Sequence, residues 1–75
     1  MISGIQSNLV IVFSSCSNEN RASALSERII ESGLAGCIKI LPVKISIYMW
    51  KGKLIKEPEV LLMIKTLENK VEQLK

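Results

Sequence analysis

Two runs of apolar, strand-favouring residues constrain the fold of this chain more than any other feature. They are LVIVF at residues 9–13 and VLLMI at residues 60–64, and every position in both runs is apolar. A continuous apolar run of this length is typical of a strand that is buried on both faces. We therefore expect both runs to be strands at central positions of one small sheet.

The segment after the first run predicts a turn and then a helix. Residues 14–18 are polar, and Ser17 or Asn18 is suited to cap a helix that spans about residues 19–32. Gly33 stands where a glycine commonly follows the end of a helix. Four apolar residues with helical spacing are expected to share the buried face of this helix: Ala22, Leu25, Ile29 and Ile30.

A second strand and a hairpin follow the helix. Residues 37–41 alternate as a strand, and Pro42 predicts an edge strand or a bulge because proline cannot donate to the ladder. Residues 43–50 alternate again, Lys51–Lys53 predicts the tip of a hairpin, and residues 59–66 predict a third strand. The alternation gives two faces, with Val43, Ile45, Ile47 and Met49 on the side of the subunit's own helices and Lys44, Ser46, Tyr48 and Trp50 on the other.

The predicted order is β-α-β-β-α, with a second helix that begins near Leu67. A helix between the first two strands implies a right-handed crossover between parallel strands. This order opens a ferredoxin-like split-βαβ fold of the α+β class, with the fourth strand missing. Seventy-five residues make one domain at most, and we divide them into a flexible lead over residues 1–8 and a partial domain over residues 9–75.

Composition excludes several classes of function. The chain has no histidine, so it cannot build Ser-His-Asp or Cys-His catalysis by itself. Its net charge is +3, but the lysines are scattered, and only Trp50 beside Lys51 and Lys53 hints at nucleic acid, which we disfavour as a partner. Two cysteines do not make a disulfide scaffold, and no segment is typical of a signal peptide or a membrane span, so we expect a reduced, cytoplasmic protein.

The two cysteines are the candidate ligands for a metal ion. Cys16 is expected in a polar loop near a helix N-terminus, where the thiolate form is favoured and where a soft metal such as copper could bind. Cys37 begins the second strand and is expected to be a core thiol, with metal binding as the alternative. Three copies of the chain in one assembly would supply three copies of each thiol.

Tyr48, Trp50 and Lys65 are the remaining candidate site residues. Tyrosine and tryptophan are enriched at protein interfaces, so we interpret Tyr48 and Trp50 as interface residues, with a ligand pocket or stacked nucleobases as the alternatives. Lys65 ends the third strand, where it either is a solvated strand end or binds an anion in a cleft between subunits.

Together, several short motifs resemble the CutA divalent-cation tolerance family. They are LAGC at residues 34–37, Pro42, SIYMWKGK at residues 46–53, Glu59-Val60 and Ile64-Lys65-Thr66, and the resemblance runs from about Leu9 to Thr66. It implies a ferredoxin-like subunit in a compact homotrimer, similar in plan to the PII signalling proteins. It also implies a non-enzymatic role in tolerance to copper or another divalent metal, and a PII-like small-molecule or anion sensor is the alternative.

Three departures from that family bear on the expectation. The family cysteine after the first strand falls on Ser14, two positions before Cys16, and a family alanine is replaced by Gly36. The family continues through a histidine-containing segment and a fourth strand, which this sequence lacks, and without that strand we expect residues 9–13 to be an open edge. We consider a fragment of a longer protein, a decayed gene product and a chain rescued by trimerisation, and we expect the chain alone to be poorly stable or self-associating.

Overall fold

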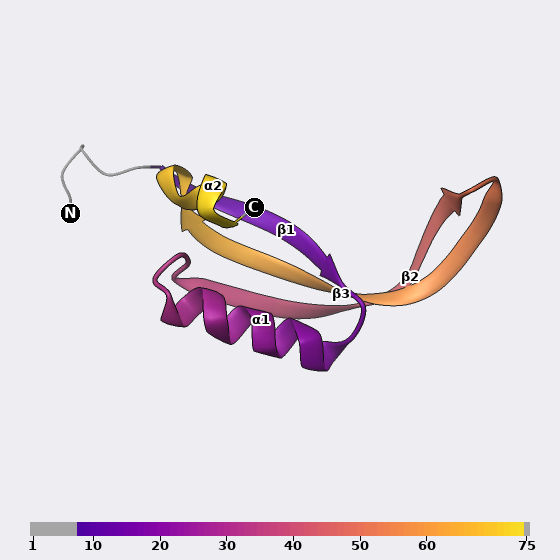
Figure 1. The fold of residues 1–75 in the computed structure, drawn as a ribbon, viewed down its shortest axis with the longest axis horizontal. Helices are drawn as coiled ribbons and strands as arrows, with labels where there is room; N and C mark the ends of the chain where they lie inside the picture. Colours follow the sequence, from indigo (N-terminus) through magenta and orange to yellow (C-terminus); the bar gives the residue numbers. More distant parts are fainter. Residues whose placement is uncertain (1–7, 75) are drawn as a thin grey trace.

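One three-stranded antiparallel sheet carries a single long helix on one face (Figure 1). The computed structural model describes residues 8–74. The predicted lead over residues 1–8 lies outside this range except for Asn8, whose carbonyl oxygen accepts a 2.8 Å hydrogen bond from the Glu68 amide. The elements in chain order are β1 (Leu9–Cys16), α1 (Glu19–Glu31), β2 (Cys37–Trp50), β3 (Lys53–Leu67), the 3₁₀ helix η1 (Glu68–Lys70) and α2 (Val71–Leu74).

The strand order is β1-β3-β2, and β3 pairs antiparallel with both neighbours. β1 and β2 therefore run parallel to each other on either side of β3, and α1 makes the crossover between them. The predicted element order is confirmed. Within the described residues β1 lies at an edge of the sheet, because its ladder pairs with β3 alone. The central position that its apolar run favours is therefore wrong, whereas the open edge expected for residues 9–13 is confirmed.

Both ends of α1 are fixed by local hydrogen bonds that the sequence predicts. The side chain of Asn18 accepts a 2.9 Å hydrogen bond from the Arg21 amide, so Asn18 is the N-cap. At the other end, the Gly33 amide donates to the Ile30 carbonyl and the Leu34 amide to the Ile29 carbonyl. This pair of bonds is a Schellman motif, and it needs the positive φ of 78° that Gly33 adopts without a steric penalty.

Small side chains let α1 lie close to the sheet. Ala22 is fully buried in one cluster with the core residues Leu62 and Ile64 of β3, and Ser26, one turn later, is 8% exposed. Leu25 and Ile30, which we predicted in the buried face, are 37% and 40% exposed, because they lie on the two flanks of the Ala22–Ser26 stripe. A prediction from hydrophobic periodicity favours large apolar residues. It therefore placed the centre of the buried face of α1 away from the small residues Ala22 and Ser26.

A bulge in β2 reverses the alternation of its side chains. Val43 pairs with Glu59 and Ser46 with Glu57, so two residues of β2, Lys44 and Ile45, stand opposite one residue of β3. Because Glu57 and Glu59 share a face, Val43 and Ser46 share it too. The prediction that Val43 shares a face with Ile47 and Met49 is therefore wrong. Neither proline ends its strand: Pro42 lies within β2, and Pro58 lies within β3, which begins at Lys53 and not at residue 59 as predicted.

The part of the β2–β3 hairpin beyond the bulge, residues 46–57, projects past the helix, and we call it the arm (Figure 1). A strand of 14 residues extends about 46 Å and a helix of 13 residues about 20 Å, so α1 covers less than half of β2. Ile47 and Met49 lie on the helix side but are 62% and 64% exposed, so the prediction that they cover the subunit's own helices is wrong. A two-residue turn at Lys51 and Gly52, with φ of 51° and 78°, closes the arm as predicted.

Within residues 8–74, none of the helices has the length and apolar character that crossing a membrane requires.

Candidate functional site

Tyr48 and Trp50 lie on one face of the arm, as their alternation predicts. Tyr48 pairs with Ile55 and Trp50 with Lys53 across the hairpin, and these partners are two residues apart on β3. Their face is continuous with the face of the sheet that α1 leaves bare, which we call the helix-free face. Tyr48 is 39% and Trp50 is 60% exposed, so each presents a large aromatic surface that no other described residue covers.

Two carboxylates hold the base of the arm on the helix-free face. The Tyr48 hydroxyl donates a 2.7 Å hydrogen bond to Glu57 Oε1, and the Ser46 hydroxyl donates to Glu59 Oε1. The bulge makes these pairs, because it brings Ser46 and Tyr48 onto the same face as both glutamates. The hydrogen bond to Glu57 raises the pKa of Tyr48, and partial desolvation and the negative charges of Glu57 and Glu59 act in the same direction.

Trp50 already has a cationic neighbour from its own chain. The Lys51 ammonium lies 5.6 Å from the centroid of the Trp50 ring, which is within the range of a cation–π contact. A nucleobase that stacked on this face of the ring would have to displace Lys51. The arrangement therefore does not favour the nucleic-acid interpretation of the arm.

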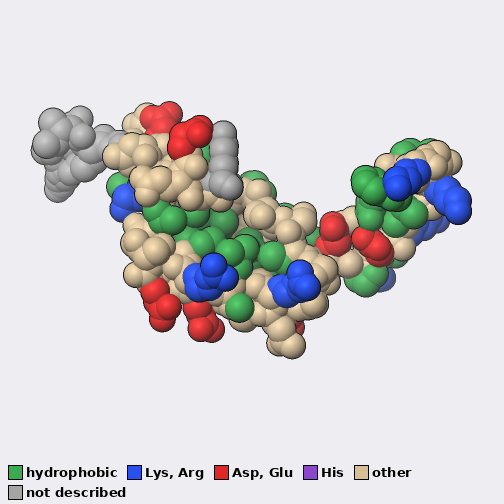
Figure 2. Space-filling model, in the orientation of Figure 1, with side chains coloured by type: hydrophobic (Ala, Val, Ile, Leu, Met, Phe, Trp, Pro, Cys, Tyr) green, Lys and Arg blue, Asp and Glu red, His purple; other side chains and the backbone are tan. Residues whose placement is uncertain are grey.

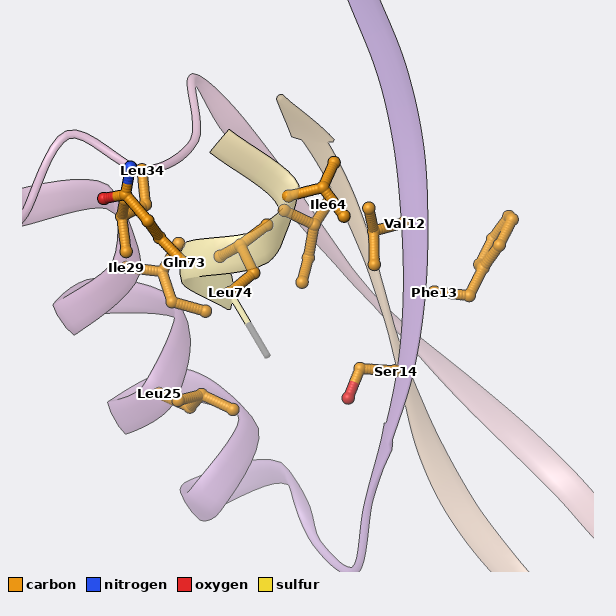
Figure 3. A pocket seen from close by; sticks show the side chains of 10 residues that line it. Val12, Phe13, Ser14, Leu25, Ile29, Leu34, Ile64, Gln73 and Leu74 are labelled. Atoms are coloured by element: carbon orange, nitrogen blue, oxygen red, sulfur yellow. The ribbon is translucent and has the colours of Figure 1, made fainter. Parts of the chain in front are cut away.

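The helix-free face continues from the arm onto the sheet as an apolar surface. Phe13 is 59% exposed and points away from the side of β1 on which α1 lies (Figure 3). On the described part of the chain no helix covers this surface, although hydrophobic residues of all three strands lie on it. Its most exposed large residues are Leu9, Ile11, Phe13 and Leu41.

Lys65 lies in the middle of this apolar face, on the central strand. It pairs with Ile11 of β1 and Cys37 of β2, and its side chain is exposed. It also lines a hollow of about 290 Å³ together with Lys70, whose ammonium donates a 2.8 Å hydrogen bond to the Gly33 carbonyl. Lys65 is therefore an exposed cation on a mainly apolar face, two positions before the end of β3.

The two cysteines occupy environments opposite to those we predicted. Cys16 is the last residue of β1, half-buried, and packs against the core on the helix side, so it is not in a polar loop. Cys37 is half-buried on the helix-free face, with its sulfur 4.0 Å from the Lys39 ammonium, so it is not a core thiol. The polar loop is shorter than predicted because β1 continues through Ser14 and Ser15.

One chain does not bring the two thiols into one metal site. Cys16 pairs with Val60 and Cys37 with Lys65, so the thiols are five residues, or about 16 Å, apart along β3 and lie on opposite faces. Among residues 8–74 there is no group of three or more histidine, cysteine or acidic side chains that could hold a metal ion.

Two features of the site escaped the sequence reasoning. The contacts of Glu57 and Glu59 depend on the bulge, and a local alternation pattern does not locate a bulge. Arg21 and Arg28 line a common hollow of about 530 Å³ beside the end of β1. Their spacing of seven residues, two turns of a helix, was a signal that could have placed them on one side of α1.

Residues 10–75 match the model of the family described as CutA1 divalent ion tolerance protein. A Xenopus laevis protein named "Protein CutA homolog" is 40% identical over 70 residues, which cover 93% of this chain and 46% of that protein. A Thermus thermophilus protein named "Divalent-cation tolerance protein CutA" is 32% identical over 65 residues, covering 87% of this chain and 63% of that protein. The chain thus spans only part of the length of these relatives.

Solved structures show the same architecture. A crystal structure of CutA1 from Oryza sativa superposes with a TM-score of 0.87 at 33% identity, covering 92% of this chain and 63% of that chain. The structure of the divalent cation tolerance protein from Thermus thermophilus gives a TM-score of 0.83 at 30% identity, covering 89% of this chain and 65% of that one. The predicted ferredoxin-like α+β fold is confirmed. On the family match and these likenesses together, the chain belongs to the CutA1 divalent ion tolerance family.

Proposed function

We propose that this chain is a non-enzymatic, cytoplasmic subunit of a homotrimer that serves tolerance to divalent metal ions. The match of residues 10–75 to the divalent ion tolerance family carries this proposal. The arrangement of the thiols supports a role in which metal binding depends on assembly, because one chain offers each thiol separately. Copper is the metal we favour, since thiolates bind Cu(I) at low coordination number.

The bare apolar surfaces support assembly. Trp50 on the arm and Phe13 on the sheet are each about 60% exposed, on the same helix-free face. Aromatic side chains at the centre of an interface are frequent hot spots, and a small monomer rarely leaves so large an apolar surface in water. Cys37 lies on this face, so subunits that meet through it would bring several copies of Cys37 near one another.

A metal competition experiment tests the proposal. We expect the assembled chain to take Cu(I) from a chromogenic chelator, and we expect Cys37→Ser to lose most of this capacity. Cys16→Ser is the matched control, because Cys16 packs on the helix side away from the proposed interface. Sedimentation of the same samples reports the assembly. An unchanged copper affinity in the Cys37→Ser, Cys16→Ser double variant would refute the metal role.

Trp50→Ala tests the link between assembly and metal. The side chain is exposed in the single chain, so the substitution should leave the fold intact and weaken association, by about 2 kcal/mol or more if Trp50 is a hot spot. We expect the variant trimer to dissociate at a higher protein concentration than the native trimer does, and we expect its copper capacity to fall as it dissociates. Full copper capacity in a chain that sediments as a monomer would contradict the dependence on assembly.

A small-molecule or anion sensor of the PII-like kind is the second candidate, and Lys65 favours it. Lys65 is exposed among apolar neighbours and lines a hollow with Lys70. An anion bound there would be attracted by the ammonium groups of both lysines. Titration with inorganic phosphate, compared between the native chain and Lys65→Gln, would distinguish this candidate from the metal role.

A further inference from the structure

A hollow of about 300 Å³, which we call the α1–β2 hollow, lies on the flank of α1 that faces away from β1. Four residues from the second half of α1 and one residue of β2 line it: Ser26, Glu27, Ile30, Glu31 and Ile38. α2 begins on the opposite flank, where Val71 and Leu74 line a separate hollow between α1 and β1. The second helix and the fourth strand that complete a ferredoxin-like fold belong on that opposite flank, so they leave the α1–β2 hollow open.

The positions of its residues around α1 give this hollow a floor, walls and a rim. At 3.6 residues per turn, four of them follow one another over about 140° of the helix surface, in the order Ser26, Ile30, Glu27 and Glu31. Ser26 is 8% exposed and forms the floor, whereas both glutamates are exposed and form the rim. Ile30 and, from β2, Ile38 supply apolar walls between them.

None of the three polar side chains of the hollow has a partner within residues 8–74. The Ser26 oxygen is buried without a hydrogen bond, and neither carboxylate forms a hydrogen bond or an ion pair. Glu27 and Glu31 are four residues apart, so their Cβ atoms are about 5–6 Å from each other, and like charges at this spacing repel. No basic residue of the described chain lines the hollow. A bound cation would therefore remove a repulsion that the chain itself leaves uncompensated.

The lining favours an organic cation over a metal ion. Two carboxylates and one hydroxyl are fewer ligands than Ca²⁺ or Mg²⁺ takes, and a hydrated metal ion gains nothing from isoleucine walls. A primary ammonium group has three N–H donors, which match the three acceptors without partners. An alkyl chain attached to it would cover Ile30 and Ile38, and burial of their apolar surface is favourable.

We propose that the α1–β2 hollow binds a primary alkylammonium ion. Glu27 and Glu31 hold the ammonium group, and the alkyl chain lies against the two isoleucines. The third N–H donates to the Ser26 hydroxyl, which no hydrogen bond holds in place and which can turn about its Cα–Cβ bond toward the ligand. In Figure 2 acidic side chains gather at the outer edge of α1, away from the hydrophobic surface between α1 and β1.

This site goes beyond the proposed role in metal tolerance and uses neither cysteine. The net charge of +3 does not attract cations to the chain as a whole, so binding depends on the two carboxylates of the hollow. The hollow lies on the helix side of the sheet, whereas the proposed interface is the helix-free face. A subunit can therefore be assembled and carry the alkylammonium ion at the same time.

The direct test is titration of the full chain at pH 7 with four probes, followed by calorimetry and by ¹H–¹⁵N NMR. Hexylammonium is the complete ligand, ammonium lacks the chain, hexanol lacks the charge, and hexyltrimethylammonium lacks the N–H donors. We expect one hexylammonium per chain, with amide shifts centred on residues 26–31 and Ile38. We expect the other three probes to bind at least tenfold more weakly. Equal binding of hexylammonium and hexyltrimethylammonium would overturn the proposal, because the three acceptors would then not be used.

A charge-matched pair of variants locates the site. The double variant Glu27→Gln, Glu31→Gln should bind hexylammonium at least tenfold more weakly, which corresponds to about 1.4 kcal/mol. The control Glu19→Gln, Glu68→Gln removes the same charge elsewhere and should bind as the native chain does. All four side chains are exposed, so circular dichroism should show intact folds. Equal weakening in both double variants would overturn the proposal, because binding would then follow net charge.

Ser26→Ala tests the floor of the hollow separately. The variant should bind hexylammonium more weakly and hexyltrimethylammonium as the native chain does, because only the first probe donates to the hydroxyl. A loss of fold does not explain such a difference, since both probes are measured on the same variant. An equal change in the affinity for both probes, or none, would overturn the proposal.

Two other sources of positive charge give distinguishable results. Binding of Mg²⁺ that is lost in Glu27→Gln, Glu31→Gln, without binding of hexylammonium, would assign the carboxylates to a metal ion and overturn the proposal. Nα-Acetyllysine amide carries the same alkylammonium group as the lysines of a protein. Binding as tight as that of hexylammonium would support a lysine side chain as the natural source, and weaker binding would support a free amine. None of these results touches the metal role, which is read from Cys37 and from copper competition.

Discussion

The Ser26 hydroxyl is a buried polar group without a partner, and removing it should stabilise the fold. Ser26 is 8% exposed on the inner side of α1, and its oxygen has no hydrogen-bond partner among residues 8–74. An unsatisfied buried donor or acceptor costs about 1–3 kcal/mol. Serine is also a poorer helix former than alanine by about 0.5 kcal/mol. The lost contacts of one oxygen atom offset part of this gain, so we expect Ser26→Ala to raise the free energy of unfolding by about 1–2 kcal/mol.

Ser23→Ala on the same helix is the matched control. Ser23 is only partly buried, so its substitution gains helix propensity without relieving a buried hydroxyl. The difference between the two variants isolates the cost of the Ser26 oxygen, and we expect it to be at least about 0.5 kcal/mol in favour of Ser26→Ala.

Urea titration followed by far-ultraviolet circular dichroism measures both variants, at one protein concentration because association shifts the apparent stability. In a domain of this size, 1 kcal/mol corresponds to a rise in Tm of about 4–8 °C. If Ser26→Ala gains no more than Ser23→Ala, the oxygen is satisfied in solution and the reasoning is refuted.

Three further predictions concern the arm and the bare face. Tyr48 is the only tyrosine, so its absorbance titration at alkaline pH should have a midpoint above 10, and Glu57→Gln should lower that midpoint while Glu27→Gln on α1 should not. A raised pKa favours the neutral phenol, so any stability linked to Tyr48 is present below pH 10 and is lost as the pH rises through the folded-state pKa; equal midpoints in the native chain and Glu57→Gln would contradict the contact. Gly52→Ala should lower the free energy of unfolding in urea by about 1–2 kcal/mol, because alanine pays a steric penalty at a φ of 78°, and no loss would mean that the turn is not as described. Phe13→Lys should lower the sedimentation coefficient of the assembled protein by placing a charge on the helix-free face, and an unchanged coefficient would exclude that face from the interface.

The sequence predicts the local features of this fold well because short-range chemistry determines them. Asn18 and Gly33 bound α1 through hydrogen bonds that span only a few residues, and the two-residue turn requires only that its own backbone adopt positive φ. The family and the fold follow from motifs that cover most of the chain. These features carry their information in the identity of one or two residues and do not depend on the rest of the sheet.

The errors concern features that depend on distant parts of the chain. The position of β1 at an edge depends on which strands are available to pair with it, and a run of apolar residues does not contain that information. The environments of Cys16 and Cys37 were exchanged because strand ends and sheet faces are set by pairing with β3. The reversal of faces after Val43 depends on one extra residue opposite Pro58, which no periodicity argument that treats β2 alone can detect.

The bulge also divides the β2–β3 hairpin into two parts with different means of support. Before the bulge, α1 covers one face of the ladder and β3 also pairs with β1; beyond it, the arm is held by its own hydrogen bonds and by the contact of Tyr48 with Glu57. The arm can therefore open and close without unfolding the core, and its amides should exchange with solvent on a separate and faster timescale. Contacts from a neighbouring subunit would slow the exchange of the arm amides and leave that of the core amides unchanged. The exchange rate of the arm therefore reports whether subunits are assembled.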